Sequence, residues 1–329
     1  MTKSHGSKAM VLCAGLGTRL RPLTHHIPKP LVPAPDVPIV FHTLRRLEAS
    51  GVSECVVNLH HLPHAVRAAL GGSFGNMRIL YSHEPEILGP TGGIRKALDM
   101  LGEDPFFVIN GDIYSEVNYE ALMRRHAQSS AGLTIAALAG IPASPLNALG
   151  FDSGCRLRQV WDSPAWNGPA LDRGINIGVF VYSPEVIRSH VPPGAFYGFR
   201  DDFIPDLFRS AEIINVFPYR GYWTDIGNDK AYLAFLADIL QGRVSGLQGG
   251  HVVSPGARIH AAAAVQAPCH IGDGCTVAAG ARVGPLAVLG AGSHLGEGCT
   301  ATRCMVAPGA SAPAGMRIQD EIFIGLVTK

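Results

Sequence analysis

The sequence predicts an α/β protein: a Rossmann-like, mostly parallel sheet with helices on both faces, followed by a short left-handed parallel β-helix. Two observations lead to this prediction. Over roughly the first two hundred residues, short apolar runs alternate with segments of helical periodicity, as in βαβ units. From Val253 onward, an aliphatic residue recurs at every sixth position. We therefore expect two domains, 1–240 and 251–329, joined by the glycine-rich stretch 241–250.

The elements of the first domain follow from its apolar runs and the residues that interrupt them. Residues 8–14 (KAMVLCA) form an apolar run that ends in a glycine loop, which predicts a buried strand. The next expected elements are a helix over 38–50, a strand over 54–59, a helix over 64–70, a strand over 77–81, a helix over 92–101 and a strand over 105–109. Ligands of such sheets bind at the carboxyl ends of the strands. Because the glycine loop and Asp112 both follow strand ends, we expect a site there.

The second domain is predicted from its repeat. The aliphatic positions of the repeat are Val253, Ile259, Val265, Ile271, Val277, Val283, Leu289 and Leu295. From Ile259 on, a small residue lies two positions before each of them, as expected where side chains stack inside a hexapeptide β-helix. Cys269 and Cys275 occupy small positions and are expected to fill the core. At about three hexapeptides per coil, the segment predicts roughly three coils.

Composition excludes several classes of function. A formal net charge of +1 provides no basic field for nucleic acid or for an anionic membrane surface. No apolar run reaches the ~18 residues of a membrane span, and the first residues contain no apolar signal segment. The seven cysteines form no C-x-x-C pairs, so they predict neither a disulfide framework nor a zinc site. We expect a cytoplasmic protein.

Residues 13–33 (CAGLGTRLRPLTHHIPKPLVP) have the composition of a phosphate-binding loop. They match neither the dinucleotide-binding motif nor the P-loop, because the third glycine and the Lys-Ser/Thr ending are missing. Gly15 and Gly17 would let backbone N–H groups approach phosphates closely. Arg19 would offer a planar, multi-donor contact, and Lys29 a compact charge.

The run GLGTRLRPLT at residues 15–24, followed by PKPL at 28–31, resembles the signature of the sugar-phosphate nucleotidyltransferases, also called nucleotide-sugar pyrophosphorylases. Further segments resemble motifs of that family in the family's order: LGPTGG at 88–93, NGD at 110–112, GINIGV at 174–179 and YWTDIG at 222–227. Pro90 and Thr91 depart from the commoner LGTxGG. The resemblance covers residues 8 to about 240, and many members carry a β-helix tail like this one.

Within the family, the resemblance is closest to the mannose-1-phosphate guanylyltransferases. It implies that a nucleoside triphosphate, with GTP favoured, reacts with a hexose-1-phosphate to give a nucleotide sugar and pyrophosphate. It assigns catalytic roles to Arg19, Lys29 and Asp112. The nucleotide-binding residues that it implies are Leu12, Ala14, Gly15, Gly17, Thr18, Gly92 and Gly93.

The resemblance also implies a sugar site and a metal site. Glu84 and Asn176 would lie near the sugar. Many members hold the sugar phosphate with a lysine after the middle strand, but residues 158–164 (RQVWDSP) contain none. Either Arg173 or Arg200 supplies that charge, or the sugar phosphate is held in a different way. Asp112 and Asp225 would bind Mg²⁺, which prefers carboxylates together with phosphate oxygens. From the residues alone, Asp112 could also be a turn residue and Asp225 a helix N-cap, and Asn176 could equally be a turn residue at a strand end.

Other functions stay open at this stage. Uridylyl or thymidylyl transfer to another sugar-1-phosphate is the first alternative. The β-helix could be an acyltransferase with a base chosen from His251, His260, His270 and His294, or the chain could be a non-catalytic sensor of nucleotide sugars. The prism faces, rich in Ala, Val and Gly, would be flat and apolar, which predicts a homo-oligomer.

Overall fold

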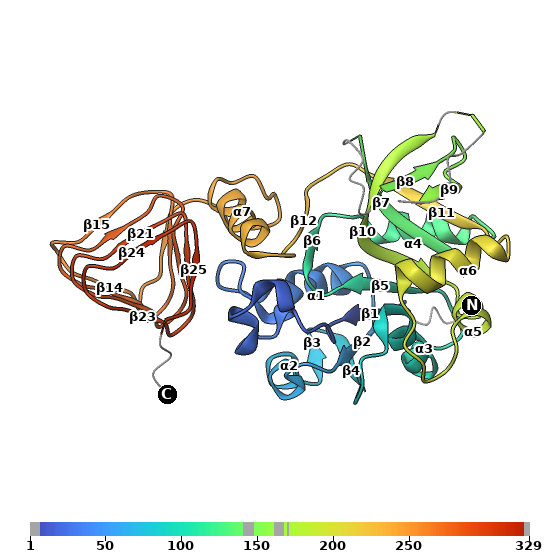
Figure 1. Cartoon of the computed structure of the whole chain (residues 1–329), viewed down its shortest axis with the longest axis horizontal. Coiled ribbons are helices and arrows are strands. Elements are labelled where there is room, and N and C mark those ends of the chain that lie inside the picture. Colours follow the sequence, from blue (N-terminus) through green and yellow to red (C-terminus); the bar gives the residue numbers. More distant parts are fainter. Residues whose placement is uncertain (1–6, 141–147, 161–167, 170, 326–329) are drawn as a thin grey trace. The chain divides into compact units, whose positions relative to one another are not determined.

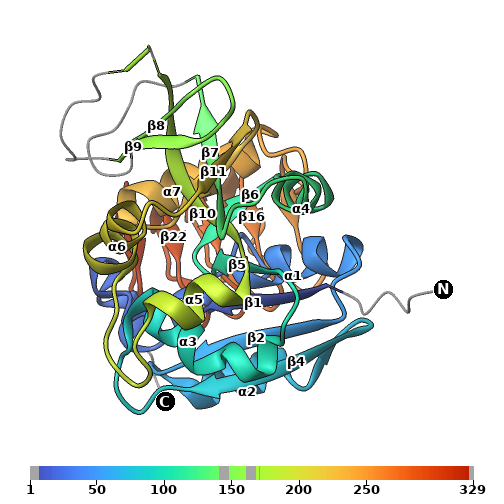
Figure 2. The same ribbon diagram turned by 90° about the vertical axis from the view of Figure 1, so that its right-hand side faces the viewer.

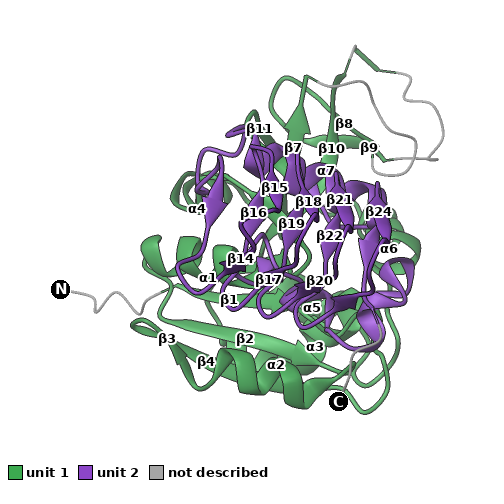
Figure 3. Cartoon of the chain, turned by 90° about the vertical axis from the view of Figure 1, so that its left-hand side faces the viewer, with its two compact units in different colours: residues 1–16, 40–223 green, residues 17–39, 224–329 purple. Residues whose placement is uncertain are grey.

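The computed structural model describes residues 7–140, 148–160, 168–169 and 171–325. It divides into two compact units, Met1–Leu16 with Val40–Trp223, and Gly17–Ile39 with Thr224–Lys329 (Figure 3). We call the first the sheet unit and the second the β-helix unit. Residues 15–24 are thereby divided, because Gly15 belongs to the sheet unit and Gly17 to the β-helix unit.

The elements of the first half of the chain alternate as the sequence predicts. They are β1 (Lys8–Leu12), α1 (Ile39–Ala49), β2 (Glu54–Leu59), α2 (Pro63–Leu70), β3 (Ser73–Phe74), β4 (Met77–His83), α3 (Gly89–Leu101), β5 (Phe106–Asn110), β6 (Ile113–Ser115) and α4 (Tyr119–Ala127). The six elements expected over 38–109 are confirmed, and α3 begins three residues before its expected start. The short strand β3, which forms a hairpin with β4, was not predicted.

The following elements extend the sheet and then lead to the β-helix. They are β7 (Leu133–Ala139), β8 (Ala148–Phe151), β9 (Leu157–Val160), β10 (Asp172–Tyr182), α5 (Pro184–His190), η4 (Phe199–Phe203), α6 (Ile204–Arg209), β11 (Ile214–Tyr219), β12 (Trp223–Asp225) and α7 (Asp229–Leu240). The main path of the sheet runs β11-β7-β10-β5-β1-β2-β4-β3. Strands β5, β1, β2 and β4 are mutually parallel, whereas β10 runs antiparallel to β5 and β7.

Helices cover both faces of this sheet, as predicted. On one face, Met10, Val56 and Val108 form a single core with apolar residues of α3, α5 and α6. Figure 2 shows α3 and α5 lying over the sheet. On the other face, the ring of Phe107 packs against Tyr119 of α4, with ring centroids 5.5 Å apart. These strands are therefore buried on both sides, which explains their almost continuously apolar sequences.

The β-helix unit begins with a loop of three short 3₁₀ turns, η1 (Thr18–Leu20), η2 (Leu23–His25) and η3 (Lys29–Leu31). Two contacts tie this loop to later parts of the same unit. The Tyr232 hydroxyl of α7 donates a hydrogen bond to the Pro33 carbonyl at 2.7 Å. The His270 Nε2 atom lies 2.6 Å from a carboxylate oxygen of Asp36.

The remaining strands form a left-handed β-helix with three parallel sheets (Figure 1). The β13 sheet contains β13 (Val252–Val253), β16 (His270–Ile271), β19 (Val288–Leu289), β22 (Met305–Val306) and β25 (Ile322–Phe323). The β14 sheet contains β14 (Arg258–Ile259), β17 (Thr276–Val277), β20 (His294–Leu295) and β23 (Ser311–Ala312). The β15 sheet contains β15 (Ala264–Val265), β18 (Arg282–Val283), β21 (Thr300–Thr302) and β24 (Arg317–Gln319).

The β-helix is longer than the roughly three coils that the repeat predicts. In the part of the chain that the structure describes, four complete coils are followed by one more strand. The visible period ends at Leu295 because the next inward residue is the small Ala301, and because Val306 follows Ala301 after five positions instead of six. Val306 pairs with Leu289, seventeen positions upstream, whereas Leu289 pairs with Ile271, eighteen positions upstream. Cys269 and Cys275 are fully buried in the core, as predicted.

The outer surfaces of the prism differ from the apolar faces expected from the sequence. The outward rows of the β14 and β15 sheets are mainly polar and contain Arg258, Thr276, His294, Ser311, Arg282, Thr300 and Arg317. Only the row of the β13 sheet is largely apolar, and its Val288 and Met305 are already buried within the chain. The expectation of flat, exposed apolar faces was therefore wrong, because composition does not reveal which residues point outward.

The helices were inspected over residues 7–140, 148–160, 168–169 and 171–325 alone, the part of the chain that the structure describes. None of them combines the length and the apolar character needed to cross a membrane.

Candidate active site

The sheet unit brings several of the predicted site residues to one edge. Because β5, β1, β2 and β4 are adjacent and parallel, their carboxyl ends lie together. Leu12, Asp112 and Glu84 stand at or just after three of these ends. Strand β10 runs in the opposite direction with Val179 opposite Ile109, so Asn176 lies beyond the end of β5, at the same edge.

A buried chain of hydrogen bonds connects two loops at this edge. The backbone N–H of Cys13 donates to Asn58 Oδ1 at 2.7 Å, and Asn58 Nδ2 donates to Glu84 Oε1 at 2.7 Å. The other Glu84 oxygen accepts from the backbone N–H of Leu88 at 3.1 Å. Glu84 is only 1% exposed, and both of its carboxylate oxygens are used inside the protein. Asn58 thus links the loop after β1 with the loop before α3.

Asn58 was not among the residues that the sequence singled out. It is the one amide in the otherwise apolar end of a predicted strand, ECVVNL. A polar residue at a buried strand end is a usable signal, but its partners come from segments far away in sequence. The adjacent Gly93 is required for the same contacts, because a Cβ atom there would lie 2.6 Å from Glu84 Oε1.

The Asn110-Gly111-Asp112 turn lies directly against the loop after β1. The Gly111 N–H donates to the Leu12 carbonyl at 3.0 Å, and a Cβ atom at Gly111 would lie 2.7 Å from that oxygen. Asp112 is half-buried. Burial, with a smaller effect from Cys55 and Asp112, raises the pKa of the Cys13 thiol well above its ordinary value. Cys13 is therefore a packing residue here, because a thiol of that kind is not a nucleophile.

Asn176 lies in a segment of β10 that needs glycine. The Asn176 side chain accepts a hydrogen bond from the Gly178 N–H at 2.9 Å. Gly178 has a φ of +75°, and a Cβ atom there would lie 2.5 Å from Asn110 Nδ2. The GINIGV pattern thus has a local structural reason, which is the close approach of β10 to the end of β5.

The second glycine loop forms the first turn of α3. Both Thr91 and Gly92 donate backbone hydrogen bonds to the Tyr197 carbonyl at 3.2 Å. A Cβ atom at Gly92 would lie 2.6 Å from the Ala195 carbonyl oxygen. Glycine is needed here for the packing of the 195–197 segment on the helix start. A nucleotide-binding role for Gly92 and Gly93 stays a prediction.

The β-helix unit holds the cationic part of the predicted site. Gly17 has a φ of +62°, and its carbonyl accepts from the Thr24 hydroxyl at 2.8 Å. A Cβ atom at Gly17 would lie 2.9 Å from Thr24 Cγ2 and 3.3 Å from Lys29 Cβ. The loop therefore folds back so that the base of Lys29 lies beside Gly17. Lys29 is 9% exposed, whereas Thr18 and Arg19 are exposed.

Asp225 and Arg19 lie close to each other at Gly227. A Cβ atom on this glycine would lie 2.9 Å from Asp225 Oδ2 and 3.4 Å from Arg19 Nη1. Asp225 does not cap the following helix, because Asn228 is the N-cap of α7 and accepts from the Ala231 N–H at 2.9 Å. The β-helix unit thus brings a guanidinium and a carboxylate together from two segments about two hundred residues apart in sequence.

The two arginines proposed to replace the missing lysine both belong to the sheet unit. Arg173 is an exposed residue of β10, where it pairs with Gly150 of β8. Arg200 is half-buried in the π-helical turn η4. Residues 161–164 of the RQVWDSP segment lie outside the described residues.

The residues suited to metal binding are few. Over the described ranges, no group of three or more His, Cys, Asp or Glu side chains is arranged to hold a metal ion. Asp112 and Asp225 are each half-buried carboxylates, the donor type that Mg²⁺ prefers, and they belong to different compact units. Either carboxylate alone would leave most coordination positions of such an ion to phosphate oxygens and water.

Comparison with known proteins adds an independent observation. A family model described as "Nucleotidyl transferase" matches residues 8–242. A UTP–glucose-1-phosphate uridylyltransferase of Synechocystis sp. is 30% identical over 289 residues, covering 80% of this chain and 74% of that protein. A mannose-1-phosphate guanylyltransferase of Mycobacterium tuberculosis is 28% identical over 285 residues, covering 82% and 78%. The crystal structure of HddC from Yersinia pseudotuberculosis superposes with a TM-score of 0.59 at 25% identity, covering 69% of this chain and 97% of that one.

Proposed function

Because this chain belongs to the nucleotidyl transferase family and is a sugar-1-phosphate nucleotidyltransferase, we propose that its reaction joins GTP to mannose-1-phosphate, giving GDP-mannose and pyrophosphate. The observation that carries the choice of substrate is the similarity to mannose-1-phosphate guanylyltransferases over 82% of the chain. The catalytic domain is proposed to span residues 1–240 and the β-helix domain residues 251–329.

In the proposed reaction, an oxygen of the sugar-1-phosphate attacks the α-phosphorus of the triphosphate. A new P–O bond forms as the bond to the bridging oxygen breaks, and pyrophosphate leaves with that oxygen. Because no covalent intermediate with the protein is needed, the protein positions the two phosphates and neutralises their charge. Arg19 would contact the triphosphate with several N–H groups, and Lys29 would hold a localised charge near the α-phosphate.

The polar edge of the sheet unit is proposed to hold the nucleoside and the sugar. Leu12, Ala14 and the Gly92-Gly93 loop would line the base and ribose, and Gly15, Gly17 and Thr18 would offer backbone N–H groups to phosphates. Asn176 would reach the sugar hydroxyls. Glu84 would act mainly by fixing the loop positions, since both of its carboxylate oxygens already accept hydrogen bonds. Arg173 or Arg200 would balance the charge of the sugar phosphate.

Asp112 and Asp225 are proposed as ligands of Mg²⁺. A bound Mg²⁺ ion would neutralise phosphate charge during transfer. The support for this proposal is the chemistry of the donors, two half-buried carboxylates.

The alternative base and sugar have specific support. One similar protein is a UTP–glucose-1-phosphate uridylyltransferase, at 30% identity over 80% of the chain. Uridylyl or thymidylyl transfer to another sugar-1-phosphate is therefore the second candidate. A panel of four nucleoside triphosphates against several sugar-1-phosphates, measured by pyrophosphate release, separates the candidates. The highest kcat/KM with GTP and mannose-1-phosphate supports our proposal, and a higher value with UTP or dTTP overturns it.

The β-helix acyltransferase and the non-catalytic sensor have less support. Of the histidines proposed as bases, His270 contacts Asp36, and His294 Nδ1 lies 2.6 Å from the Thr276 hydroxyl. Thiol release from acetyl-coenzyme A would support the acyltransferase. Failure of every substrate pair to release pyrophosphate would favour the sensor.

A cytoplasmic location and self-association are also proposed. The polar outer rows of the β14 and β15 sheets give no reason for association, whereas the first coil does. Its inward residues have a neighbouring coil on only one side: Val253 is 40% exposed, and Ile259 and Val265 are half-buried. Open ends of stacked repeats need a cap, and a second copy of this chain would provide one.

A further inference from the structure

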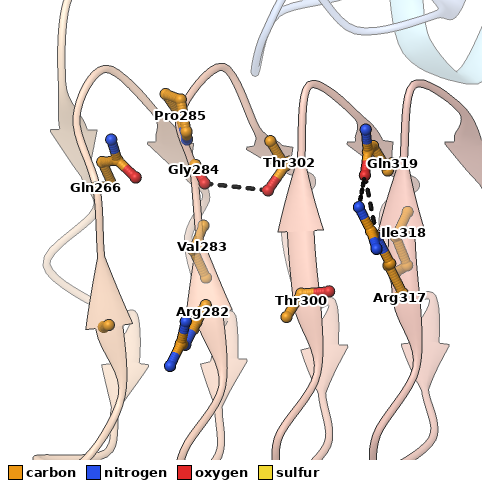
Figure 4. Close-up of a pocket in the computed structure, with 11 residues that line it drawn as sticks. Gln266, Arg282, Val283, Gly284, Pro285, Thr300, Thr302, Arg317, Ile318 and Gln319 are labelled. Carbon is orange, nitrogen blue, oxygen red and sulfur yellow. Dashed lines mark hydrogen bonds between the residues drawn. The ribbon is translucent and has the colours of Figure 1, made fainter.

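The outer surface of the β15 sheet contains a groove that the proposed reaction does not use. It has a volume of about 570 Å³, within the range of small-molecule sites. Eleven residues of β15, β18, β21 and β24 and their adjoining turns line it, and Figure 4 shows them. None of these residues belongs to the nucleotidyl-transfer site described above.

The strand register places two arginines on either side of a threonine. Arg282 pairs with Thr300, and Thr300 pairs with Arg317, so the three residues form one outward row across adjacent strands (Figure 4). Neighbouring strands lie roughly 4.8 Å apart, which separates the backbones of the two arginines by about 10 Å. The Arg317 guanidinium donates to Gln319 in this structure, and a rotation of its side chain toward Thr300 would let both guanidinium groups reach a single group bound above the Thr300 hydroxyl.

The charge of this row is not balanced within the groove. No acidic residue lines it. The carboxylate of Asp320, which adjoins the lining residue Gln319, is held by Arg303 in a two-point ion pair at 2.6 Å. Among the described residues, neither Arg282 nor Arg317 pairs with a carboxylate. Two guanidinium groups at this spacing repel each other, and an anion between them would remove the repulsion.

A second outward row beside the first offers neutral polar groups. It runs Gln266–Gly284–Thr302–Gln319, and Gly284 leaves the row without a side chain at that position. The Thr302 hydroxyl donates to the Gly284 carbonyl at 3.2 Å, and Gln319 Oε1 accepts from Arg317 Nε at 3.0 Å. Gln319 Nε2 donates one of its two N–H groups to Asp320 Oδ2 at 3.2 Å. Its second N–H, the amide of Gln266 and the hydroxyl of Thr300 suit a ligand with several hydroxyl groups.

We propose that the groove of the β15 sheet is a binding site for a phosphorylated sugar. The phosphate would lie between Arg282 and Arg317 above Thr300, with its oxygens accepting from guanidinium and hydroxyl groups. The sugar would lie over Gly284, with its hydroxyls bonded to Gln266 and Gln319. An unphosphorylated sugar would lack the negative charge that Arg282 and Arg317 attract. Inorganic phosphate would make no contact with Gln266 and Gln319.

Site-resolved arginine modification on the full chain tests this proposal. Phenylglyoxal modifies guanidinium groups, and mass spectrometry of peptides gives a separate rate for each arginine. Glucose 6-phosphate is the probe, and inorganic phosphate and glucose, at matched ionic strength, are the comparison ligands. Arg258, an exposed arginine in the outward row of the β14 sheet, is the internal control.

We expect glucose 6-phosphate to slow the modification of Arg282 and Arg317 at least fivefold and saturably, with Arg258 unchanged. Inorganic phosphate should require at least tenfold higher concentration, and glucose should protect neither arginine. Thr300→Val should raise the half-protecting concentration of glucose 6-phosphate several-fold, whereas the matched Thr276→Val on the β14 sheet should not. Equal protection of all three arginines, or none, would overturn the site, and equal potency of inorganic phosphate would overturn the sugar part. The readout does not depend on turnover, so its failure is distinguishable from failure of the proposed reaction.

Discussion

At the scale of single residues, Asn58 connects the loop after β1 with the loop before α3. It accepts from the Cys13 backbone and donates to Glu84, and both side chains are almost fully buried. Loss of its amide would leave a buried N–H group and one carboxylate oxygen without their partners. Unsatisfied buried groups of this kind are costly, and most so when charged.

We therefore expect Asn58→Ala to lower the free energy of unfolding by about 2–4 kcal/mol. The exposed Asn118, which caps α4 by accepting from the Ala121 N–H, is a matched control. Asn118→Ala should cost only about 1 kcal/mol, because water can replace its contact. Urea denaturation of the three proteins measures both values. Equal losses for the two variants would contradict the role given to Asn58.

The two proposed metal ligands permit a second test at this scale. Asp112→Asn and Asp225→Asn should each reduce kcat by at least a hundredfold at saturating Mg²⁺, with the melting temperature nearly unchanged. If both residues act through one ion, the double variant should be scarcely worse than either single variant. Initial rates of pyrophosphate release at varied Mg²⁺ provide the measurement. Near-normal turnover of either single variant would exclude the pair.

Sequence motifs located these residues but did not reveal their contacts. The glycine loop, NGD and YWTDIG were recognisable because each has a local sequence pattern. In the structure, the glycine loop and NGD follow strand ends, and Asp225 of YWTDIG lies near Arg19 at Gly227. The link through Asn58 was missed because Cys13, Asn58 and Glu84 lie on three separate segments. The proximity of Asp225 to Arg19 also depends on how distant segments pack, which no local pattern encodes.

At the scale of elements, α4 contains a buried histidine that does not serve the site. His126 Nδ1 lies 2.9 Å from the Thr134 hydroxyl of β7, and Nε2 lies 3.0 Å from the Ser183 hydroxyl. Burial lowers the pKa of His126 to about 4. The histidine is therefore neutral in the folded protein at pH values where the unfolded chain already binds a proton.

This pKa shift predicts a loss of stability in acid. In the unfolded chain, His126 binds a proton below its ordinary pKa of about 6.5, whereas in the folded protein it does so only near pH 4. The free energy of unfolding therefore falls as the pH falls from about 6.5 to about 4. The folded and unfolded pKa values differ by about 2.5, which corresponds to about 3 kcal/mol in the free energy of unfolding. Between pH 7.5 and pH 4, the His126→Gln variant, which keeps a polar side chain, should lose about 3 kcal/mol less stability than the unmodified protein. Parallel losses in chemical denaturation at the two pH values would contradict the assignment.

The elements also show what a periodic sequence can and cannot predict. The six elements over 38–109 have strong apolar patterns, and the structure confirms them. The β-helix was recognised from its period, yet its length was underestimated because the coil that ends at Val306 has one residue fewer. Which outward rows are polar, and which row is buried, depends on the three-sheet register rather than on composition.

At the scale of the whole molecule, the β-helix contacts the loop that contains Arg19 and Lys29, through His270 and Asp36. Truncation after Gly242 would keep the Tyr232 contact to Pro33 and remove the His270 contact to Asp36. We assume that the loop must be ordered for phosphoryl transfer. The lost charge-assisted hydrogen bond stabilises the ordered loop by about 1.4 kcal/mol, so its removal should lower kcat roughly tenfold. We therefore expect a truncated chain that releases pyrophosphate more slowly and forms a smaller oligomer or a monomer.

Light scattering and turnover of the full and truncated chains test this prediction together. His270→Ala in the full chain should reproduce most of the loss of kcat without changing the oligomeric state. His260→Ala is the matched control, because His260 is an exposed residue of the same β-helix. An unchanged oligomeric state after truncation would refute the assembly role. A folded truncated chain without any turnover would show that the tail completes the active site.

The most direct test of the central claim is the release of pyrophosphate by the full chain given GTP, mannose-1-phosphate and Mg²⁺. We predict that GDP-mannose and pyrophosphate form in equal amounts, and that omission of either substrate abolishes both. Lys29→Ala should lower kcat by at least a hundredfold, whereas Lys230→Ala, at an exposed position of α7, should not. Absence of pyrophosphate with this pair and with every other combination of nucleoside triphosphate and sugar-1-phosphate would contradict the account.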